Sequence, residues 1–332
     1  MAARAAAFSD PEVKAVLEGH FVPIAENCSY LQRQQDAEGD LFRLIAEQGH
    51  YGGRFQPTDT RQGMYVCAPD GALLASCNVH GADRLLPVLR GALERWGARG
   101  DRVAAPPTGE GATDARFLRN APEDGLVLRV WARDLPREGV PVSPGDGQWR
   151  RRAFNLDHAW FRREEAAALL PAAGTAAVWP QSLARRLVRY HLIDNVRGET
   201  PMWRPEEVQV ATVRTRMTNA AGDRVELSFE GEAAMVHRGA WVDDFSRERH
   251  ESEHRIEVRI DGSAEWSTDL GRFVRFDLAA TGTRWGATQY NSRGGDPGPA
   301  PIGFALELAA APAMAGDTTP PQGIGADYFG GR

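Results

Sequence analysis

The sequence predicts an α+β protein of several domains, and three observations lead to this class. The 332-residue chain is long enough for two or three domains that each bury a core. Its first hundred residues mix short apolar runs with helical patterns, as an α/β domain does. From Glu206 onward apolar residues recur at every second position, which is typical of antiparallel strands. We therefore expect an amino-terminal α/β domain, a mixed central segment and a carboxy-terminal antiparallel β domain.

The composition of the chain indicates which kinds of partner to expect. Hydrophobic residues make up 42% of the chain and charged residues 25%, which is ordinary for a soluble globular protein. The formal net charge is −6 and basic residues are spread among acidic ones, so we expect no nucleic-acid partner. No apolar run approaches the roughly 18 residues of a membrane span, and residues 1–10 lack the pattern of an export signal. The composition favours a cytoplasmic protein that binds an unknown small molecule or protein partner, with no cofactor.

The first hundred residues contain five expected elements. A helix begins at Ser9 or Asp10, which can cap it, and Pro11 suits its first turn. The apolar run Phe21–Ala25 predicts a strand, and Pro23 inside it favours an edge position or a bulge. The elements that follow are a helix at about 36–48, a hairpin of strands at 64–68 and 72–77 joined by a Pro-Asp-Gly turn, and an amphipathic helix at 85–96.

The order of these elements resembles that of bacterial thioredoxin-like proteins over about residues 8–96. The resemblance is carried by the segments Ser9-Asp10-Pro11-Glu12-Val13, Phe21-Val22-Pro23-Ile24, Gln56-Pro57-Thr58 and Pro69-Asp70-Gly71. It implies a truncated thioredoxin-like domain in which Pro57 takes the place of the family's cis-proline beside the active site. The chain departs from the family in having no Cys-x-x-Cys motif, so the dithiol chemistry of the family does not carry over.

The rest of the chain divides by composition. Residues 97–116 are rich in Gly, Pro and Ala without periodicity, which predicts a linker. Residues 117–203 form the mixed segment, with a strand at 126–131 and helices at 161–170 and 182–193. Residues 204–312 form the β-rich domain, whose strands predict a strongly curved or partly closed sheet. The tail at 313–332 has the composition of a disordered segment.

Cys28 is the strongest thiol candidate. It follows an apolar run, and a helix beginning near Ser29 would lower the pKa of its thiol and favour the thiolate. The alternative is a half-buried cysteine that only packs. Cys67 and Cys77 lie in the two arms of the expected hairpin, where their separation depends on register. We expect them to be reduced, because three cysteines make no disulfide framework.

The segment His250-Glu251-Ser252-Glu253-His254 matches the H-E-x-x-H pattern of zinc hydrolases. That chemistry needs a helix, which brings both imidazoles to one metal. Here the pattern leads directly into alternating apolar residues that predict a strand. In a strand His250 and His254 would lie about 13 Å apart, at roughly 3.3 Å per residue, which is too far to share one metal.

Two further groups admit a functional and a structural interpretation. One is a polar and aromatic cluster formed by Trp149, Asn155, Asp157, His158 and Trp160. Asp157 and His158 are neighbours, so in a strand their side chains would point to opposite faces and pair with other groups. The other is a set of aromatic residues in the β-rich part that would either line a ligand pocket or fill the core, namely Trp266, Phe273, Phe276, Trp285 and Tyr290.

Two function hypotheses from different classes remain, with a third behind them. The first is a single-thiol redox or thiol-transfer protein that uses Cys28 near Pro57. The second is a non-catalytic protein that binds a ligand or partner through its β domain. The third is a metal-dependent hydrolase at His250 and His254. Phosphate-binding loops and the G-x-S-x-G elbow of serine hydrolases are missing from the sequence, which disfavours those classes.

Overall fold

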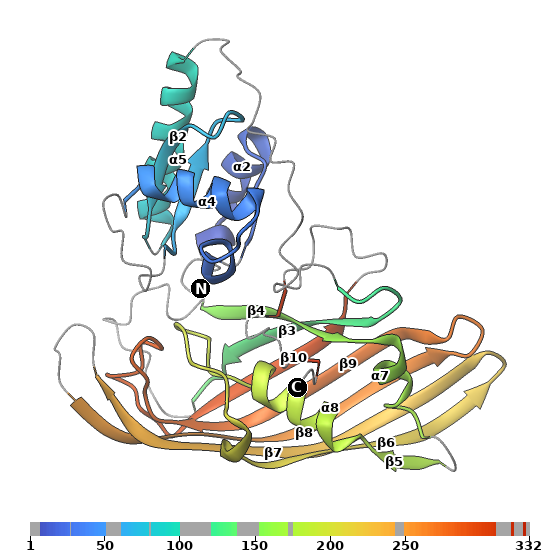
Figure 1. Ribbon diagram of the computed structural model, residues 1–332. Coiled ribbons are helices and arrows are strands. Elements are labelled where there is room, and N and C mark those ends of the chain that lie inside the picture. The colour runs from blue at the N-terminus through green and yellow to red at the C-terminus, as the bar shows by residue number, and fades with distance from the viewer. Residues whose placement is uncertain are drawn as a thin grey trace. The chain divides into compact units, whose positions relative to one another are not determined.

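The computed structural model describes residues 7–26, 28–50, 61–79, 81–99, 121–137, 153–171, 175–242, 249–309, 320–321 and 328–329. The chain divides into two compact units, an amino-terminal unit at 6–118 and a carboxy-terminal unit at 119–332 (Figure 1). The expected linker lies mostly outside the described residues, as does the predicted disordered tail, and Pro57, Trp149 and residues 243–248 lie outside them.

The amino-terminal unit packs helices around one small hairpin. Its elements are α2 (Pro11–His20), α3 (Cys28–Leu31), α4 (Ala37–Gln48), β1 (Met64–Cys67), β2 (Leu73–Cys77) and α5 (Ala82–Ala98). Asp10 caps α2 by accepting hydrogen bonds from the backbone of Glu12 and Val13. Val13, Leu85 and Leu89 form the core between α2 and α5. The helix starts and the hairpin therefore lie where the sequence predicts them.

The predicted fold class is wrong, because the described chain is mostly strand: 42% strand and 25% helix. Among its described residues the amino-terminal unit contains the two-stranded sheet of β1 and β2 and not the sheet of a thioredoxin-like α/β domain. The segment Phe21–Glu26 belongs to no strand. Val22 is 87% exposed and Ile24 79% exposed, and of the apolar residues in this run Phe21 packs against the core. Pro23 also lacks the N–H that a sheet ladder requires, which the apolar pattern alone does not reveal.

The carboxy-terminal unit is built on one eight-stranded antiparallel sheet. The strand order is β4-β3-β10-β9-β8-β7-β6-β5. The strands are β3 (Leu126–Asp134), β4 (Phe154–Phe161), β5 (Ala176–Val178), β6 (Val208–Ala221), β7 (Arg224–Val242), β8 (Arg249–Ser267), β9 (Arg272–Trp285) and β10 (Ala300–Leu308). The remaining elements are α7 (Arg163–Ala167), α8 (Gln181–His191) and the 3-10 turn η1 (Pro205–Glu207).

The mixed segment and the β-rich domain are therefore parts of a single structure. β10 pairs with β3, so that Leu306 lies opposite Val130 and Phe304 opposite Ala132. This pairing joins strands about 170 residues apart in the sequence and buries their inward side chains in one core. Period-two patterning identifies each strand but does not say which strand is its neighbour. The sequence pattern therefore does not show that strands of the two segments share one sheet.

The helix α8 lies against one face of the curved sheet (Figure 1). Leu183, Leu187 and Val188 of this helix are buried in the same core as Phe229 and Phe276 of the sheet. Glycines within the long strands permit close approach of neighbouring backbones, and Gly282 is the tightest example. A Cβ atom at Gly282 would lie 1.9 Å from the carbonyl oxygen of Glu257 on β8. Such glycines allow the sheet to bend around its core.

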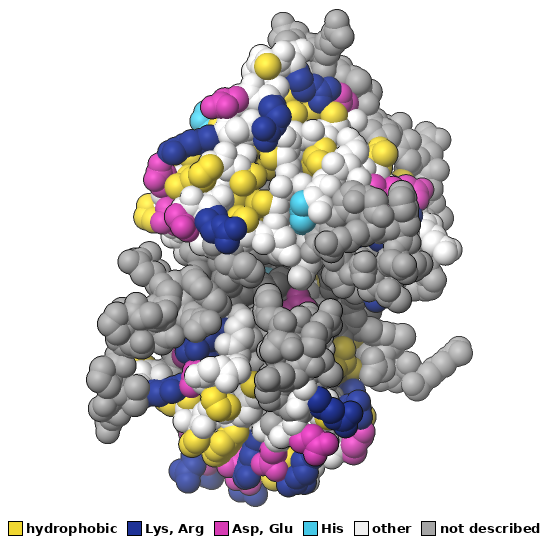
Figure 2. Space-filling model, turned by 90° about the vertical axis from the view of Figure 1, so that its left-hand side faces the viewer, with side chains coloured by type: hydrophobic (Ala, Val, Ile, Leu, Met, Phe, Trp, Pro, Cys, Tyr) yellow, Lys and Arg dark blue, Asp and Glu magenta, His cyan; other side chains and the backbone are white. Residues whose placement is uncertain are grey.

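Two surface properties bear on partners. No helix in the described part of the chain is both long and apolar enough to cross a membrane. On the face shown in Figure 2, positive and negative side chains are interspersed and do not form a large patch of one sign.

Candidate functional site

The most unusual polar site of the carboxy-terminal unit lies where α8 meets β4. β4 places Asp157, Ala159 and Phe161 on one face, because strand side chains alternate. On α8, Arg186 and Tyr190 are four residues apart and share one side of the helix, with His191 adjacent. Tyr328, which belongs to no helix or strand, packs onto this junction and is 1% exposed. We call the group Asp157, Arg186, Tyr190, His191 and Tyr328 the Tyr328 site.

A chain of hydrogen bonds runs through the Tyr328 site. Oδ2 of Asp157 lies 2.8 Å from Nδ1 of His191. Nε2 of His191 lies 2.8 Å from the hydroxyl oxygen of Tyr328. The backbone N–H of Trp160 donates to the same hydroxyl oxygen at 3.0 Å. Three segments that are distant in the sequence thus converge on one phenol oxygen.

The protonation pattern follows from these partners. When the Asp157 carboxylate accepts a hydrogen bond from Nδ1 of a neutral His191, Nε2 is left as an acceptor. Nε2 then accepts the hydroxyl proton of Tyr328, while the phenol oxygen accepts from Trp160. Burial raises the pKa of the Tyr328 hydroxyl well above its ordinary value, so it stays neutral. Every group in the chain is satisfied in this one arrangement.

Arg186 holds the aromatic ring from one side. Its guanidinium lies 5.1 Å from the ring centroid of Tyr328 and 5.0 Å from that of Phe329. Both terminal nitrogens donate to Glu165 at 2.7 Å, and one also donates to the carbonyl of Trp160 at 3.1 Å. Burial opposes ionisation of Glu165, but the hydrogen bonds from Arg186 outweigh this and lower the pKa of that carboxyl. Glu165 thereby balances the positive charge of Arg186. The flat face of the guanidinium remains in contact with the aromatic rings as a cation–π interaction.

Aromatic rings complete the site. The rings of Tyr190 and Tyr328 meet edge to face with centroids 5.1 Å apart. Arg162 lies over the ring of Phe329 at 4.6 Å. The site therefore combines a shaped aromatic slot with a single polar end that contacts the hydroxyl group. Chemically, it can hold a neutral phenol and exclude water from it.

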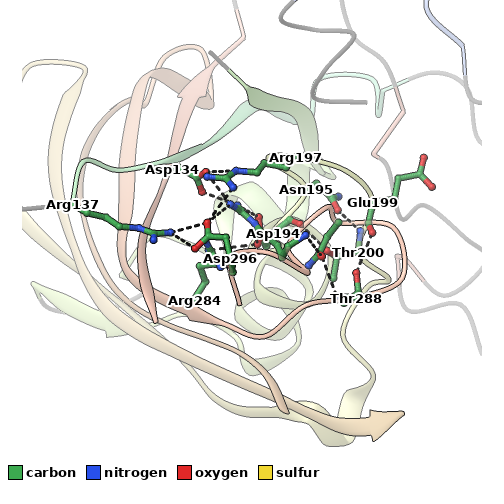
Figure 3. A network of polar contacts seen from close by, with 12 residues as sticks. Asp134, Arg137, Asp194, Asn195, Arg197, Glu199, Thr200, Arg284, Thr288 and Asp296 are labelled. Atoms are coloured by element: carbon green, nitrogen blue, oxygen red, sulfur yellow. Dashed lines mark hydrogen bonds and ion pairs between the residues drawn. The ribbon is translucent and has the colours of Figure 1, made fainter. Parts of the chain in front are cut away.

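A second polar cluster, which we call the arginine–aspartate network, lies elsewhere in the same unit (Figure 3). It contains Arg137, Arg197, Arg284, Arg293, Asp134, Asp194 and Asp296. Arg293 is fully buried and donates to both oxygens of Asp134 and of Asp194 at 2.7–2.9 Å. Arg284, also fully buried, donates to the backbone and side chain of Asp296 at 2.7 Å.

Electrostatics holds this network in its ionised form. Burial opposes ionisation of Asp134, but hydrogen bonds and charge from Arg293 lower the pKa of that carboxyl. The network ties the end of β3, the segment after α8 and the segment after β9 to one another. Because each of its arginines already binds a carboxylate, its evident role is to fix these segments.

The thiol candidates are dispersed. Cys28 is the first residue of α3, and its sulfur lies 4.0 Å from the carbonyl oxygen of Glu26. Pro57 lies outside the described residues, so its distance from Cys28 is not defined. In the hairpin, Cys67 pairs with Leu73 and Cys77 with Met64, so these two cysteines do not face each other. None of the three cysteines forms a disulfide. Burial and the charge of Asp70 raise the pKa of Cys67, which makes its thiol less reactive.

The H-E-x-x-H segment lies in β8 and not in a helix. His250 pairs with Trp241 and His254 with His237 of β7. His254 is buried and stacks on Trp203 with centroids 4.6 Å apart and an interplanar angle of 8°. No cluster of three metal-binding side chains occurs among the described residues. The strand predicted for this segment is confirmed.

The polar cluster around Asp157 contributed one member to the Tyr328 site. Asp157 and His158 point to opposite sides of β4, as the sequence predicts, and Asp157 pairs with His191 of α8. Trp266, Phe273 and Phe276 belong to the packed core, whereas Tyr290 is 54% exposed. Phe273 and Phe276 also line one open hollow of about 460 Å³ at the end of the sheet, together with Arg272, Asp277 and Glu307. Sequence reasoning missed Tyr328 and Arg186, for which the only signal was a pair of aromatic residues in a glycine-rich tail.

Comparison with known proteins adds no relative: no protein-family model matches the chain, and neither a curated protein nor a solved structure does.

Proposed function

We propose that this protein is a non-catalytic binding protein whose carboxy-terminal unit binds a tyrosine-bearing segment of a partner at the Tyr328 site. One observation carries the proposal. A tyrosine from outside every strand and helix inserts its whole side chain between α8 and β4 and is bound through its hydroxyl group. The chain's own Tyr328 is then an internal occupant of a site that a partner can also use.

The composition of the site supports binding in preference to simple core packing. An ordinary core position is filled by apolar side chains, since burying polar groups without need is costly. Here a buried carboxylate, an imidazole and a guanidinium surround one side chain. Aromatic anchors and arginine are also the residues that dominate recognition of peptides.

The sequence around the occupying tyrosine is rich in glycine. Glycines at 323, 325, 330 and 331 flank the pair Tyr328-Phe329. Glycine loses more backbone freedom on ordering than any other residue, which reduces the net stability of the docked pair. An occupant of this kind can be displaced by a competing ligand.

The thiol hypothesis for Cys28 stays a prediction with less support. Its sulfur contacts a backbone carbonyl, and α3 has only four residues to contribute a dipole. The hypothesis requires Cys28 to be alkylated about tenfold faster than Cys67 at neutral pH. Mass spectrometry of the full chain during a short iodoacetamide pulse measures both rates, and equal rates would remove the hypothesis.

A peptide-binding experiment tests the proposed function. The probe is a fluorescent peptide with the sequence of residues 323–331, added to the full chain carrying Tyr328→Ala. We expect saturable binding, seen as a rise in fluorescence anisotropy, because the substitution vacates the site. The control peptide has alanine in place of its tyrosine and should not bind.

Two results would contradict the proposal. One is an absence of binding to a folded Tyr328→Ala chain. The other is equal binding of the tyrosine and alanine peptides, which would show that the contacts lie elsewhere. The variant Tyr290→Ala is a matched control, because it removes an exposed tyrosine of the same unit and leaves the Tyr328 site occupied.

A further inference from the structure

We infer that the Tyr328 site selects a neutral phenol, so that free p-hydroxyphenyl compounds are ligands of the vacated site. This inference rests on the proposed function and adds the chemical class of the ligand. It follows from the contacts that the site makes with the hydroxyl group of Tyr328 and from those that it makes with the ring.

The hydroxyl group meets one acceptor and one donor. Nε2 of His191 accepts its proton at 2.8 Å, and the backbone N–H of Trp160 donates to its oxygen at 3.0 Å. A phenyl group of the same shape would leave both protein groups buried without this partner. Unsatisfied buried groups of this kind are the main source of selectivity for a hydroxyl-bearing ligand.

The acceptor role of His191 follows from its two partners. Asp157 accepts from Nδ1 of the neutral imidazole, and the Tyr328 hydroxyl, whose oxygen already accepts from Trp160, has its proton directed to the lone pair of Nε2. A ligand that carries only an acceptor, such as an aryl ether, would face this lone pair without a proton to share. The site therefore distinguishes a phenol from its methyl ether as well as from a phenyl group.

The ring of Tyr328 is bound through aromatic and cation–π contacts and not through hydrogen bonds. Tyr190 meets it edge to face, and Arg186 lies over one face at 5.1 Å. The positive charge of Arg186 is already paired with Glu165 at 2.7 Å, and Asp157 is buried at the polar end of the site. A phenolate or a phosphorylated tyrosine would therefore bring a second negative charge next to Asp157 without a free cation to balance it. The neutral form is the preferred ligand.

The test uses the full-length Tyr328→Ala chain with p-cresol, which reproduces the missing side chain, and toluene, which lacks only the hydroxyl group. Titration calorimetry and thermal unfolding are followed for both compounds and for 4-methylanisole. We expect p-cresol to bind about 10- to 100-fold more tightly than toluene or the ether and to raise the melting temperature saturably. The wild-type chain and Tyr290→Ala should bind none of them at this site.

The possible outcomes distinguish a failure of phenol selectivity from a failure of peptide binding. Equal binding of p-cresol and toluene would overturn the phenol selectivity and leave peptide binding intact. Binding of neither compound, together with no peptide binding, would overturn the proposed function as well. If Tyr328→Ala does not fold, Tyr328→Phe retains the ring, and the nitrogen NMR shift of Nε2 of His191 is compared with wild type. A clear shift supports the hydrogen bond that carries the selectivity, and an unchanged resonance overturns it.

Discussion

Two buried histidines of the carboxy-terminal unit differ in how their rings are satisfied. His191 has a partner on each ring nitrogen, Asp157 on one side and Tyr328 on the other. His254 stacks on Trp203, and its Nε2 makes no hydrogen bond within the described residues. Burial lowers the pKa of His254 to about 4, with the charges of Asp194, His237, Glu207 and Arg284 as smaller influences.

This pKa predicts a pH dependence of stability. The pKa of His254 in the folded chain lies below the roughly 6.5 of an unfolded histidine, so the unfolded chain binds the proton first as the pH falls. The free energy of unfolding is therefore unaffected by this group above about pH 6.5. It falls by about 3 kcal/mol as the pH decreases from 6.5 to 4. Replacing His254 with phenylalanine keeps a ring against Trp203 and should flatten the stability profile in that window. Urea unfolding of both chains from pH 4 to 8 measures the difference.

A control substitution removes a different histidine and should leave the pH dependence of stability in place. His20 ends α2 and is exposed, so His20→Gln should leave the pH profile of the wild-type chain unchanged. The explanation is wrong if the His254→Phe chain loses as much stability between pH 6.5 and 4 as the wild type does.

At the scale of elements, the arginine–aspartate network joins β3, β9 and the segments after α8 and β9. Removing one carboxylate from it leaves the buried arginines with an excess of positive charge. Asp194→Ala should therefore lower the free energy of unfolding by about 3 kcal/mol, because Arg293 keeps its burial but loses one of its two bidentate partners, the other being Asp134. Denaturant unfolding with circular dichroism measures this loss.

An exposed ion pair in the same sheet is the control. Asp277 binds Arg275 at 3.0 Å on the surface of β9, where solvent screens the charges. Asp277→Ala should change stability by less than about 1 kcal/mol. A similar effect of the two substitutions would show that the buried network does not hold these elements together.

The close contact of Gly282 with the neighbouring strand predicts that a larger residue at this position destabilises the sheet. A methyl group there would collide with the backbone of β8, since its carbon would lie 1.9 Å from the Glu257 oxygen. Gly282→Ala should cost at least about 1–3 kcal/mol through forced movement of the strands. In contrast, a Cβ at Gly294 meets nothing within 4 Å, and Gly294→Ala should be close to neutral. Thermal unfolding compares the two, and equal melting temperatures would contradict the close approach.

At the scale of the whole molecule, the sequence predicted local structure better than architecture. The cap at Asp10, the hairpin turn at Asp70 and the strand that contains His254 are determined by neighbouring residues, and local patterns found them. The pairing of β3 with β10 depends on residues far apart in the chain, which no periodicity records. The predicted thioredoxin-like arrangement failed for another reason, since the apolar run that begins at Phe21 forms no strand.

The candidate site was predictable only in part. Asp157 stood out as a carboxylate in a cluster of polar and aromatic residues, and His191 lies in a segment that the sequence predicts to be a helix. Their association depends on how α8 packs on β4, which is a tertiary contact. Tyr328 lies in a stretch whose composition predicts disorder, and its role depends on three partners from other segments. One aromatic pair in a glycine-rich tail carries too little local information to predict this.

The central claim is that Tyr328 occupies a binding site that a partner's tyrosine can fill. The most direct measurement compares the affinity of the 323–331 peptide for the wild-type chain and for the Tyr328→Ala chain. An internal ligand competes at a high effective concentration, so the peptide should bind the variant at least about tenfold more tightly than the wild type. Equal affinities for the two chains would place the peptide away from the Tyr328 site and contradict the claim.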